Sequence, residues 1–399
     1  MTNVQRLFLQ CMARGICGGH VDWEQITPED WRQLLALAQE QHVLPMVVEA
    51  AYPSAAFRAL PGEFQTAARQ QVRQMVFAQA QKNGALFEVL SGLAEAGVPV
   101  VVMKGAVCRS LYPIPEARSS ADEDLLAGPG EFEAAAALLK GRGCSCTQKS
   151  DHESEFVTPE GLYIELHRLP FPGDSFPMQG ANVHFETVFD GKYALEVPGG
   201  RIPAMPPHEH MLYLILHAFK HLIYRGFGLR QMCDILLWGE GYAAEIDWGR
   251  LEEQCAALRA WDFARAVFAL GRNHLGVELP VDTAGMEEQG ELLLEDVFAG
   301  GIFGGETLSR KHSAGITLNA VQAGQRGKKS SLLHTLFPAR KALAGRYPWL
   351  EERPFLLPAA WMLRLLGYAA EQSREDSAAE SLRIGRERTE LLRKLNVID

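Results

Sequence analysis

Two short acidic motifs, Asp122-Glu123-Asp124 and Glu165-Leu166-His167, are the parts of this 399-residue sequence best suited to do chemistry. Residues 121–126 have the composition of a short strand. In a strand, alternate side chains point to the same face. Asp122 and Asp124 would then lie about 7 Å apart along the strand. Paired carboxylates repel each other unless a cation lies nearby, and Mg²⁺ binds one or two carboxylates together with substrate phosphates. The pair therefore predicts a metal–nucleotide site.

The second motif could complete this site. In a strand within 162–169, Glu165 and His167 share one face, and Ile164 and Leu166 take the other. If the two strands are neighbours, Glu165 joins the two aspartates in a three-carboxylate cluster. Such a cluster can hold two metal ions that stabilise the attacking and leaving oxygens of phosphoryl transfer. The Pro-Glu-Gly turn at 159–161 predicts a hairpin that presents this strand.

A candidate phosphate-binding segment precedes the first motif. Lys104-Gly105-Ala106 follows an apolar, β-branched run at 98–103 and begins a helical run that ends at Tyr112. Small residues at a helix start let backbone N–H groups approach a phosphate. Lys104 and Arg118 are cations close to this segment in the sequence.

The elements that must position these residues fall into three expected regions: a helical region at 1–97, a mixed α/β unit at 98–206, and a helical region at 207–399 with a Gly-rich loop near 300–330. Thr27 and Pro28 are a typical cap and first turn of an N-terminal helix. The stretch 61–96 is predicted to be one helix or two, because Gly84 interrupts it. Helical spacing predicts further helices at about 207–225, 228–240, 247–259, 261–274 and 378–394.

The amino-acid composition limits the kinds of partner that we expect for this protein. The formal net charge of −10 and the pI near 5.7 disfavour a nucleic-acid partner. The seven cysteines are scattered, and no convincing signal peptide or membrane-spanning run is found. We therefore expect free thiols, a cytoplasmic protein and no membrane partner.

The stretch MKGAVCRSLYPIPEARSSADEDLL resembles the signature of a family of largely uncharacterised bacterial nucleotidyltransferases, within the polymerase-beta-like superfamily. The Ile-Glu-Leu-His run at 164–167 and the Leu229-Arg230 and Asp234 segment are similar to that family too. The resemblance implies an α+β fold: a polymerase-beta-like nucleotidyltransferase domain with a small mixed sheet, flanked by N- and C-terminal helical regions.

The same resemblance implies a reaction and a set of site residues. The reaction is transfer of a nucleoside monophosphate from an NTP, such as ATP, to an unknown small-molecule or protein acceptor, with Mg²⁺ or Mn²⁺. The metal ligands and catalytic residues would be Asp122, Asp124 and Glu165. Nucleotide binding is assigned to Lys104, Gly105, Ala106, Arg118, His167 and His217.

Two alternatives stay open at this point. Ala121 and Ala106, which lacks a hydroxyl, leave room for a catalytically silent nucleotide-binding or partner-binding module of the same fold. The crowded histidines between His208 and His221 allow a zinc site, although a helix with histidines packed in the core is the more usual interpretation. A separate interpretation concerns Arg230 and Asp234: they lie one helical turn apart, so they could form a local ion pair on that helix.

Overall fold

The computed structural model describes residues 1–150, 152–173, 178–224, 226–300, 340, 343, 347, 349–363 and 378–398. The chain forms two compact units, Met1–Ala218 with Leu229–Gly290, and Phe219–Gly228 with Glu291–Asp399. The Gly-rich loop expected near 300–330 lies outside the described residues from position 301 onward. The division into three regions stays a prediction.

A five-stranded mixed sheet is the centre of the first unit. Its strand order is β1-β2-β5-β4-β3. The strands are β1 (Val100–Val102), β2 (Asp122–Ala127), β3 (Ser145–Lys149), β4 (Glu153–Val157) and β5 (Tyr163–His167). Strands β2 and β5 are parallel, and the other neighbours are antiparallel. The expected α+β fold with a small mixed sheet is confirmed.

Alternation along β5 determines which side chains reach the site. Ile164 and Leu166 are fully buried on one face, and Glu165 and His167 share the other. The expected hairpin is confirmed, because β4 pairs antiparallel with β5 across a turn at 158–162. Gly161 in that turn has φ of 82°, which favours glycine. Its N–H donates to the carbonyl of Thr158.

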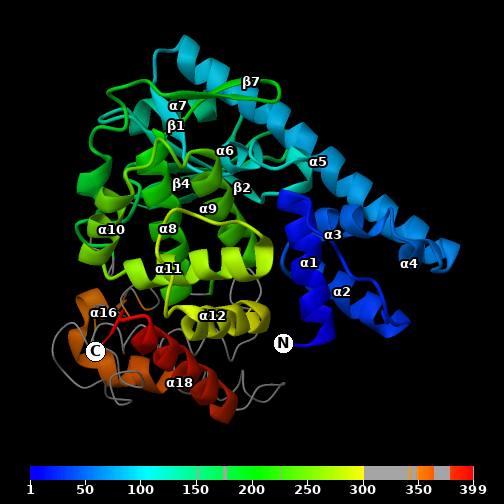
Figure 1. Ribbon diagram of the computed structural model, residues 1–399. Coiled ribbons are helices and arrows are strands. Elements are labelled where there is room, and N and C mark those ends of the chain that lie inside the picture. Colours follow the sequence, from blue (N-terminus) through cyan, green and yellow to red (C-terminus); the bar gives the residue numbers. More distant parts are fainter. Residues whose placement is uncertain are drawn as a thin grey trace. The chain divides into compact units, whose positions relative to one another are not determined.

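Five helices precede the sheet, and the two that begin at residues 28 and 62 match the predicted helix start at Thr27-Pro28 and the predicted helical stretch at 61–96. They are α1 (Asn3–Cys17), α2 (Pro28–Glu40), α3 (Leu44–Ala51), α4 (Ala55–Arg58) and α5 (Gly62–Glu95). Thr27 caps α2: its hydroxyl accepts from the Asp30 N–H at 3.1 Å, and its own N–H donates to Asp30 Oδ2 at 2.9 Å. Gly84 does not break α5, which runs unbroken from the N-terminal helices to the sheet (Figure 1).

The chain after β5 forms a second, two-stranded sheet and then helices. The elements are η2 (Ala181–Phe185), β6 (Ala194–Val197), β7 (Gly200–Pro203), α8 (Pro207–Tyr224), α9 (Leu229–Gly241), α10 (Trp248–Ala257), α11 (Trp261–Leu270), η3 (Gly271–Leu275) and α12 (Glu287–Gly300). Further along lie α16 (Trp349–Glu352), η4 (Pro354–Leu356) and α18 (Ala378–Lys394). The helices expected from 207 to 274 and from 378 to 394 are confirmed.

The second unit has its own small core. Leu343, Leu350 and Ala360 are buried together. Arg388 of α18 is buried as well, with its Nε 3.5 Å from Asp296 Oδ1. Among the described residues, no helix has the length and apolar character needed to span a membrane.

Candidate active site

The two acidic motifs lie on adjacent strands. Strands β2 and β5 are parallel, and Asp124 is the register partner of Glu165. Partners in neighbouring strands project to the same face. The side chain of Asp124 is 2% exposed, and that of Glu165 is 32% exposed. The sheet therefore holds one carboxylate inside the protein and one at the surface of the same site. The sequence predicted that these two carboxylates lie together, but not which of them is buried.

Asp124 is held between two cationic partners. Lys104 Nζ lies 3.1 Å from Asp124 Oδ2, and His167 Nε2 lies 3.3 Å from Asp124 Oδ1. Burial alone would favour the neutral acid. The charges of Lys104 and His167 and their hydrogen bonds outweigh burial, so the pKa of Asp124 lies well below its usual range. Asp124 is an ionised carboxylate at neutral pH.

His167 connects three carboxylates. Its Nε2 lies 3.6 Å from Glu165 Oε2 as well as close to Asp124, and its Nδ1 lies 3.5 Å from Glu153 Oε2. Burial opposes the charged imidazolium, but the hydrogen bonds and charges of Asp124 and Glu165 raise the pKa of His167 to about 9. The hydrogen bond with His167 lowers the pKa of Glu165. Burial and the neighbouring aspartates raise it, and their combined effect is larger, so the pKa of Glu165 lies above its usual value.

Asp124, Glu165 and His167 could hold a metal ion. In the part of the chain that the structure describes, one ligand atom of each lies within 4.8 Å of the others. Asp122 is not in this group, and its Oδ2 lies 4.0 Å from Lys104 Nζ. Carboxylate oxygens on one sheet face suit a hard divalent cation. The residues present therefore fit a divalent cation, with His167 in the place that the sequence prediction gave to Asp122. The Lys104 ammonium lies close to both aspartates.

The predicted nucleotide-binding residues are brought together beside these acids. Lys104, Gly105, Arg118 and His217 line one small cavity of about 30 Å³, together with Asp122. His217 comes from α8, with its Nε2 3.5 Å from Lys104 Nζ. Further lining residues are Ser120, Leu214, Arg230, Gln231 and Asp234. Segments more than 100 residues apart in the sequence thus meet at one place.

Two buried guanidinium groups face this cavity. Arg118 pairs with Asp234 through Nη2–Oδ2 at 2.5 Å and Nε–Oδ1 at 3.1 Å, and Tyr112 Oη donates to Asp234 Oδ1 at 2.8 Å. Arg230 instead donates to the Ser119 carbonyl. Arg118 Nη1 and Arg230 Nε make no hydrogen bond among the described residues. The suggested Arg230–Asp234 pair is wrong: Asp234 pairs with Arg118, leaving donors available to an anion.

The Lys-Gly-Ala segment has a different local structure from the one expected. Only Ala106–Arg109 is helical (α6), rather than a run to Tyr112. The Ala106 N–H donates to Glu123 Oε2 at 2.8 Å. Glu123 also accepts from Arg109 Nη2 at 2.5 Å, and both side chains are buried. The Ala106 amide is therefore bonded within the protein, and Gly105 contributes through its place in the cavity wall.

Several site residues were not singled out from the sequence. Glu153 on β4 and Arg109 on α6 carry no motif of their own, and only the fold brings them to the site. Arg230 did lie in a recognised segment, but its distance from Asp234 along the helix suggested a local pair. For Glu123, the alternation of side chains along β2 could have predicted that it points away from Asp122 and Asp124.

The histidines after position 207 do not gather into a metal site among the described residues. His210 is fully buried and stacks on Trp238, with ring centroids 4.1 Å apart. His208 Nε2 lies 2.9 Å from Gln254 Oε1. His208 and His210 belong to the packing of α8, and His217 reaches the cavity described above.

Comparisons with known proteins identify the family of this chain. A model of a family described as uncharacterised nucleotidyltransferase matches residues 27–276. A search of curated proteins gives no significant match. Two solved structures are similar. The antibiotic-resistance factor ANT(2″)-Ia is 14% identical over 47% of this chain and 94% of its own, with a TM-score of 0.31. An antigenic nucleotidyltransferase-like protein from Paracoccidioides brasiliensis is 16% identical over 50% and 94%, also with a TM-score of 0.31.

Proposed function

This chain belongs to the uncharacterised nucleotidyltransferase family, and from that premise we propose that it transfers a nucleoside monophosphate from an NTP to an acceptor, using Mg²⁺ or Mn²⁺. The observation that carries the proposal is the register of β2 and β5, which places Asp124 beside Glu165 with Lys104 and His167 in contact. The acidic net charge favours a small-molecule or protein acceptor over nucleic acid.

Asp122, Asp124 and Glu165 would hold the divalent cations, with His167 beside them. When bound, the cations supply positive charge that stabilises the phosphate oxygens in the transition state. Lys104 already lies 3.1 Å from Asp124 and 4.0 Å from Asp122. Its ammonium limits carboxylate repulsion in the free protein and can turn to a phosphate oxygen when NTP binds.

The buried guanidinium groups would receive the leaving pyrophosphate. Arg118 Nη1 and Arg230 Nε line the cavity beside Lys104 without a hydrogen-bond partner among the described residues. A buried donor without a partner costs free energy, and a phosphate oxygen would satisfy it. Asp234 fixes the orientation of Arg118 by two hydrogen bonds. These donors would stabilise charge as it develops on the leaving group.

Glu165 is the residue we propose as general base. Its side chain is partly exposed. The hydrogen bond with His167 lowers the pKa of Glu165, but burial and the neighbouring aspartates outweigh it and raise the pKa, which makes this carboxylate a better proton acceptor. The acceptor oxygen would attack the α-phosphorus while its proton passes to Glu165. The bond from the α-phosphorus to the bridging oxygen breaks, and pyrophosphate carries away the electron pair.

Nucleotide binding and transfer test the proposal separately. Each of the four NTPs is added with Mg²⁺, and thermal unfolding is followed. A ligand at a hundredfold excess over its Kd stabilises by about 2.7 kcal/mol. Transfer is then followed with NTP labelled on the α-phosphate and fractionated cell extract as acceptor.

Asp124→Asn is the test variant, and Glu160→Gln, an exposed acid in the β4–β5 turn, is the matched control. We expect Mg²⁺-dependent stabilisation by at least one NTP, and transfer reduced about 10³-fold in Asp124→Asn only. Stabilisation without transfer from any fraction would show a silent nucleotide-binding module. Full transfer by Asp124→Asn would overturn the proposal.

A further inference from the structure

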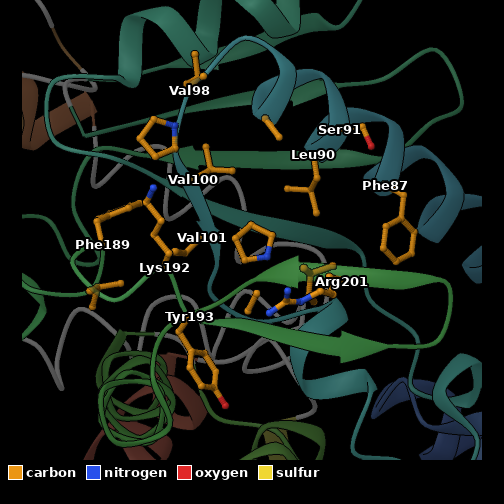
Figure 2. Close-up of a pocket in the computed structure, with 17 residues that line it drawn as sticks. Phe87, Leu90, Ser91, Val98, Val100, Val101, Phe189, Lys192, Tyr193 and Arg201 are labelled. Carbon is orange, nitrogen blue, oxygen red and sulfur yellow. The ribbon is translucent and has the colours of Figure 1, made fainter.

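A second cavity of about 550 Å³ lies in the first unit, between α5, β1 and the β6–β7 hairpin. Figure 2 shows Phe87 and Leu90 on α5, Val100 and Val101 on β1, and Arg201 on the hairpin. Pockets for small molecules span about 300–1,000 Å³ and are mostly apolar with a few polar groups. This cavity has that size.

The walls of the cavity are apolar and firmly placed. Leu90, Val100 and Ile202 are buried side chains of three different elements. The hairpin turn packs directly on α5: Gly199 has φ of 101°, and a Cβ there would lie 2.9 Å from a ring carbon of Phe87. No larger residue fits this turn without displacing the ring. The hairpin is therefore held against the helix and closes one end of the cavity.

The charged groups of the lining are all cationic. Lys192 and Arg201 line the cavity, and no Asp or Glu does. Arg201 Nε lies 3.0 Å from Glu196 Oε1 in an exposed pair. No ion pair involves Lys192 among the residues that the structure describes. An anionic group on a ligand would meet Lys192 without having to displace a carboxylate.

The strand edge adds backbone donors and acceptors. The Gly128 N–H donates to the Pro99 carbonyl, and the Met103 N–H donates to the Asp124 carbonyl. In an antiparallel ladder the backbone groups of alternate residues point to the partner strand. Those of Val100 therefore point away from β2, toward the edge that lines the cavity. This polar edge lies within an otherwise apolar wall.

The cavity is separate from the acidic cluster. Val100 pairs with Ala127, five residues along β2 from Asp122, which corresponds to about 16 Å. A nucleotide on the aspartates would not fill it. Strand β1 nevertheless leads through Met103 directly to Lys104, which contacts Asp124.

We propose that this cavity is a second ligand site, for a small molecule with an apolar body and a single anionic group such as a carboxylate. The apolar body packs between Leu90, Val100 and Ile202, and the anionic group pairs with Lys192 at the rim. This site does not depend on the proposed transferase function.

Calorimetric titration with 2-naphthoate tests the site, with 2-naphthamide as the uncharged probe of the same shape. We expect one molecule of 2-naphthoate per chain and at least tenfold weaker binding of the amide. Absence of 2-naphthoate binding, or equal affinity for both probes, would overturn the proposal.

Two exposed residues of the lining provide the variants. Ser91→Trp places an indole from α5 into the cavity and should abolish binding of both probes. Lys192→Glu should weaken 2-naphthoate at least tenfold and leave the amide unchanged. Lys140→Glu, an exposed charge reversal on α7 (Phe132–Gly141), is the matched control and should change nothing. Unchanged 2-naphthoate affinity in either lining variant would place binding elsewhere and overturn the proposal.

Discussion

At the scale of residues, the site contains two sets of buried charges in contact. Lys104, Asp124 and His167 form one contact chain, and Arg118 and Asp234 form another across the cavity. Charges this deeply buried are costly unless they are compensated. Their presence beside a cavity is typical of a functional site rather than of a core built for stability.

Gly105 is a position in the site where no residue larger than glycine fits. Its φ is 66°, and a Cβ there would overlap the carboxylate of Glu123. We expect Gly105→Ala to destabilise the protein by at least about 2 kcal/mol more than Gly130→Ala. Gly130 has φ of 79° with open space around it, so Gly130→Ala measures only the free-energy cost of placing alanine at a positive φ. Equal losses in urea unfolding would show that Glu123 moves aside freely.

His210 should make the stability depend on pH. Its burial lowers its pKa from 6.5 to about 3. Between these values the unfolded chain binds a proton that the folded chain does not, so stability falls as pH falls from 6.5 toward 3. Between pH 7 and pH 5 this residue should account for a loss of about 2 kcal/mol. His210→Phe, which keeps the aromatic stack, should remove that part of the loss in urea unfolding; an identical pH dependence would contradict the assignment.

At the scale of elements, parallel pairing of β2 with β5 makes the site, and a buried ion pair fixes β2 to α6. The sequence predicted strands at 121–126 and 162–169 from their composition and from the turn residues beside them, and the observed strands are Asp122–Ala127 and Tyr163–His167. It did not predict β3, whose five residues are polar and exposed, so that no hydrophobic period marks it. The β6–β7 hairpin was missed as well, although its Pro198-Gly199-Gly200 turn was a usable signal.

The ion pair between α6 and β2 should be important for stability. Arg109 and Glu123 are 2% and 1% exposed. Glu123→Ala would leave the Arg109 guanidinium buried without its carboxylate partner, and we expect a loss of about 3–5 kcal/mol in urea unfolding. Glu196→Ala removes a carboxylate from the exposed pair with Arg201 and should have little effect. Similar small losses in both variants would mean that Arg109 finds another partner.

At the scale of the whole molecule, distant segments supply one site: the loop after β1, strand β2 with the residues just before it, strand β5, helix α8 and helix α9. The residues of each motif, Asp122/Asp124 and Glu165/His167, are two positions apart in one predicted strand, so the sequence alone was enough to predict these motifs. The Arg118–Asp234 pair joins residues 116 positions apart, and nothing in the local pattern of either residue predicts it. The same is true of the second cavity, because its walls come from α5, β1 and the hairpin and only folding brings them together.

The carboxylates of β2 and β5 are the groups that we propose to hold a divalent cation. The most direct measurement is titration with Mn²⁺ alone, with the free ion followed by electron paramagnetic resonance, in the unmodified chain, Asp124→Asn and Glu160→Gln. We predict saturable binding by the unmodified chain and Glu160→Gln, and at least tenfold weaker binding by Asp124→Asn. Equal Mn²⁺ affinity in all three proteins would contradict the account.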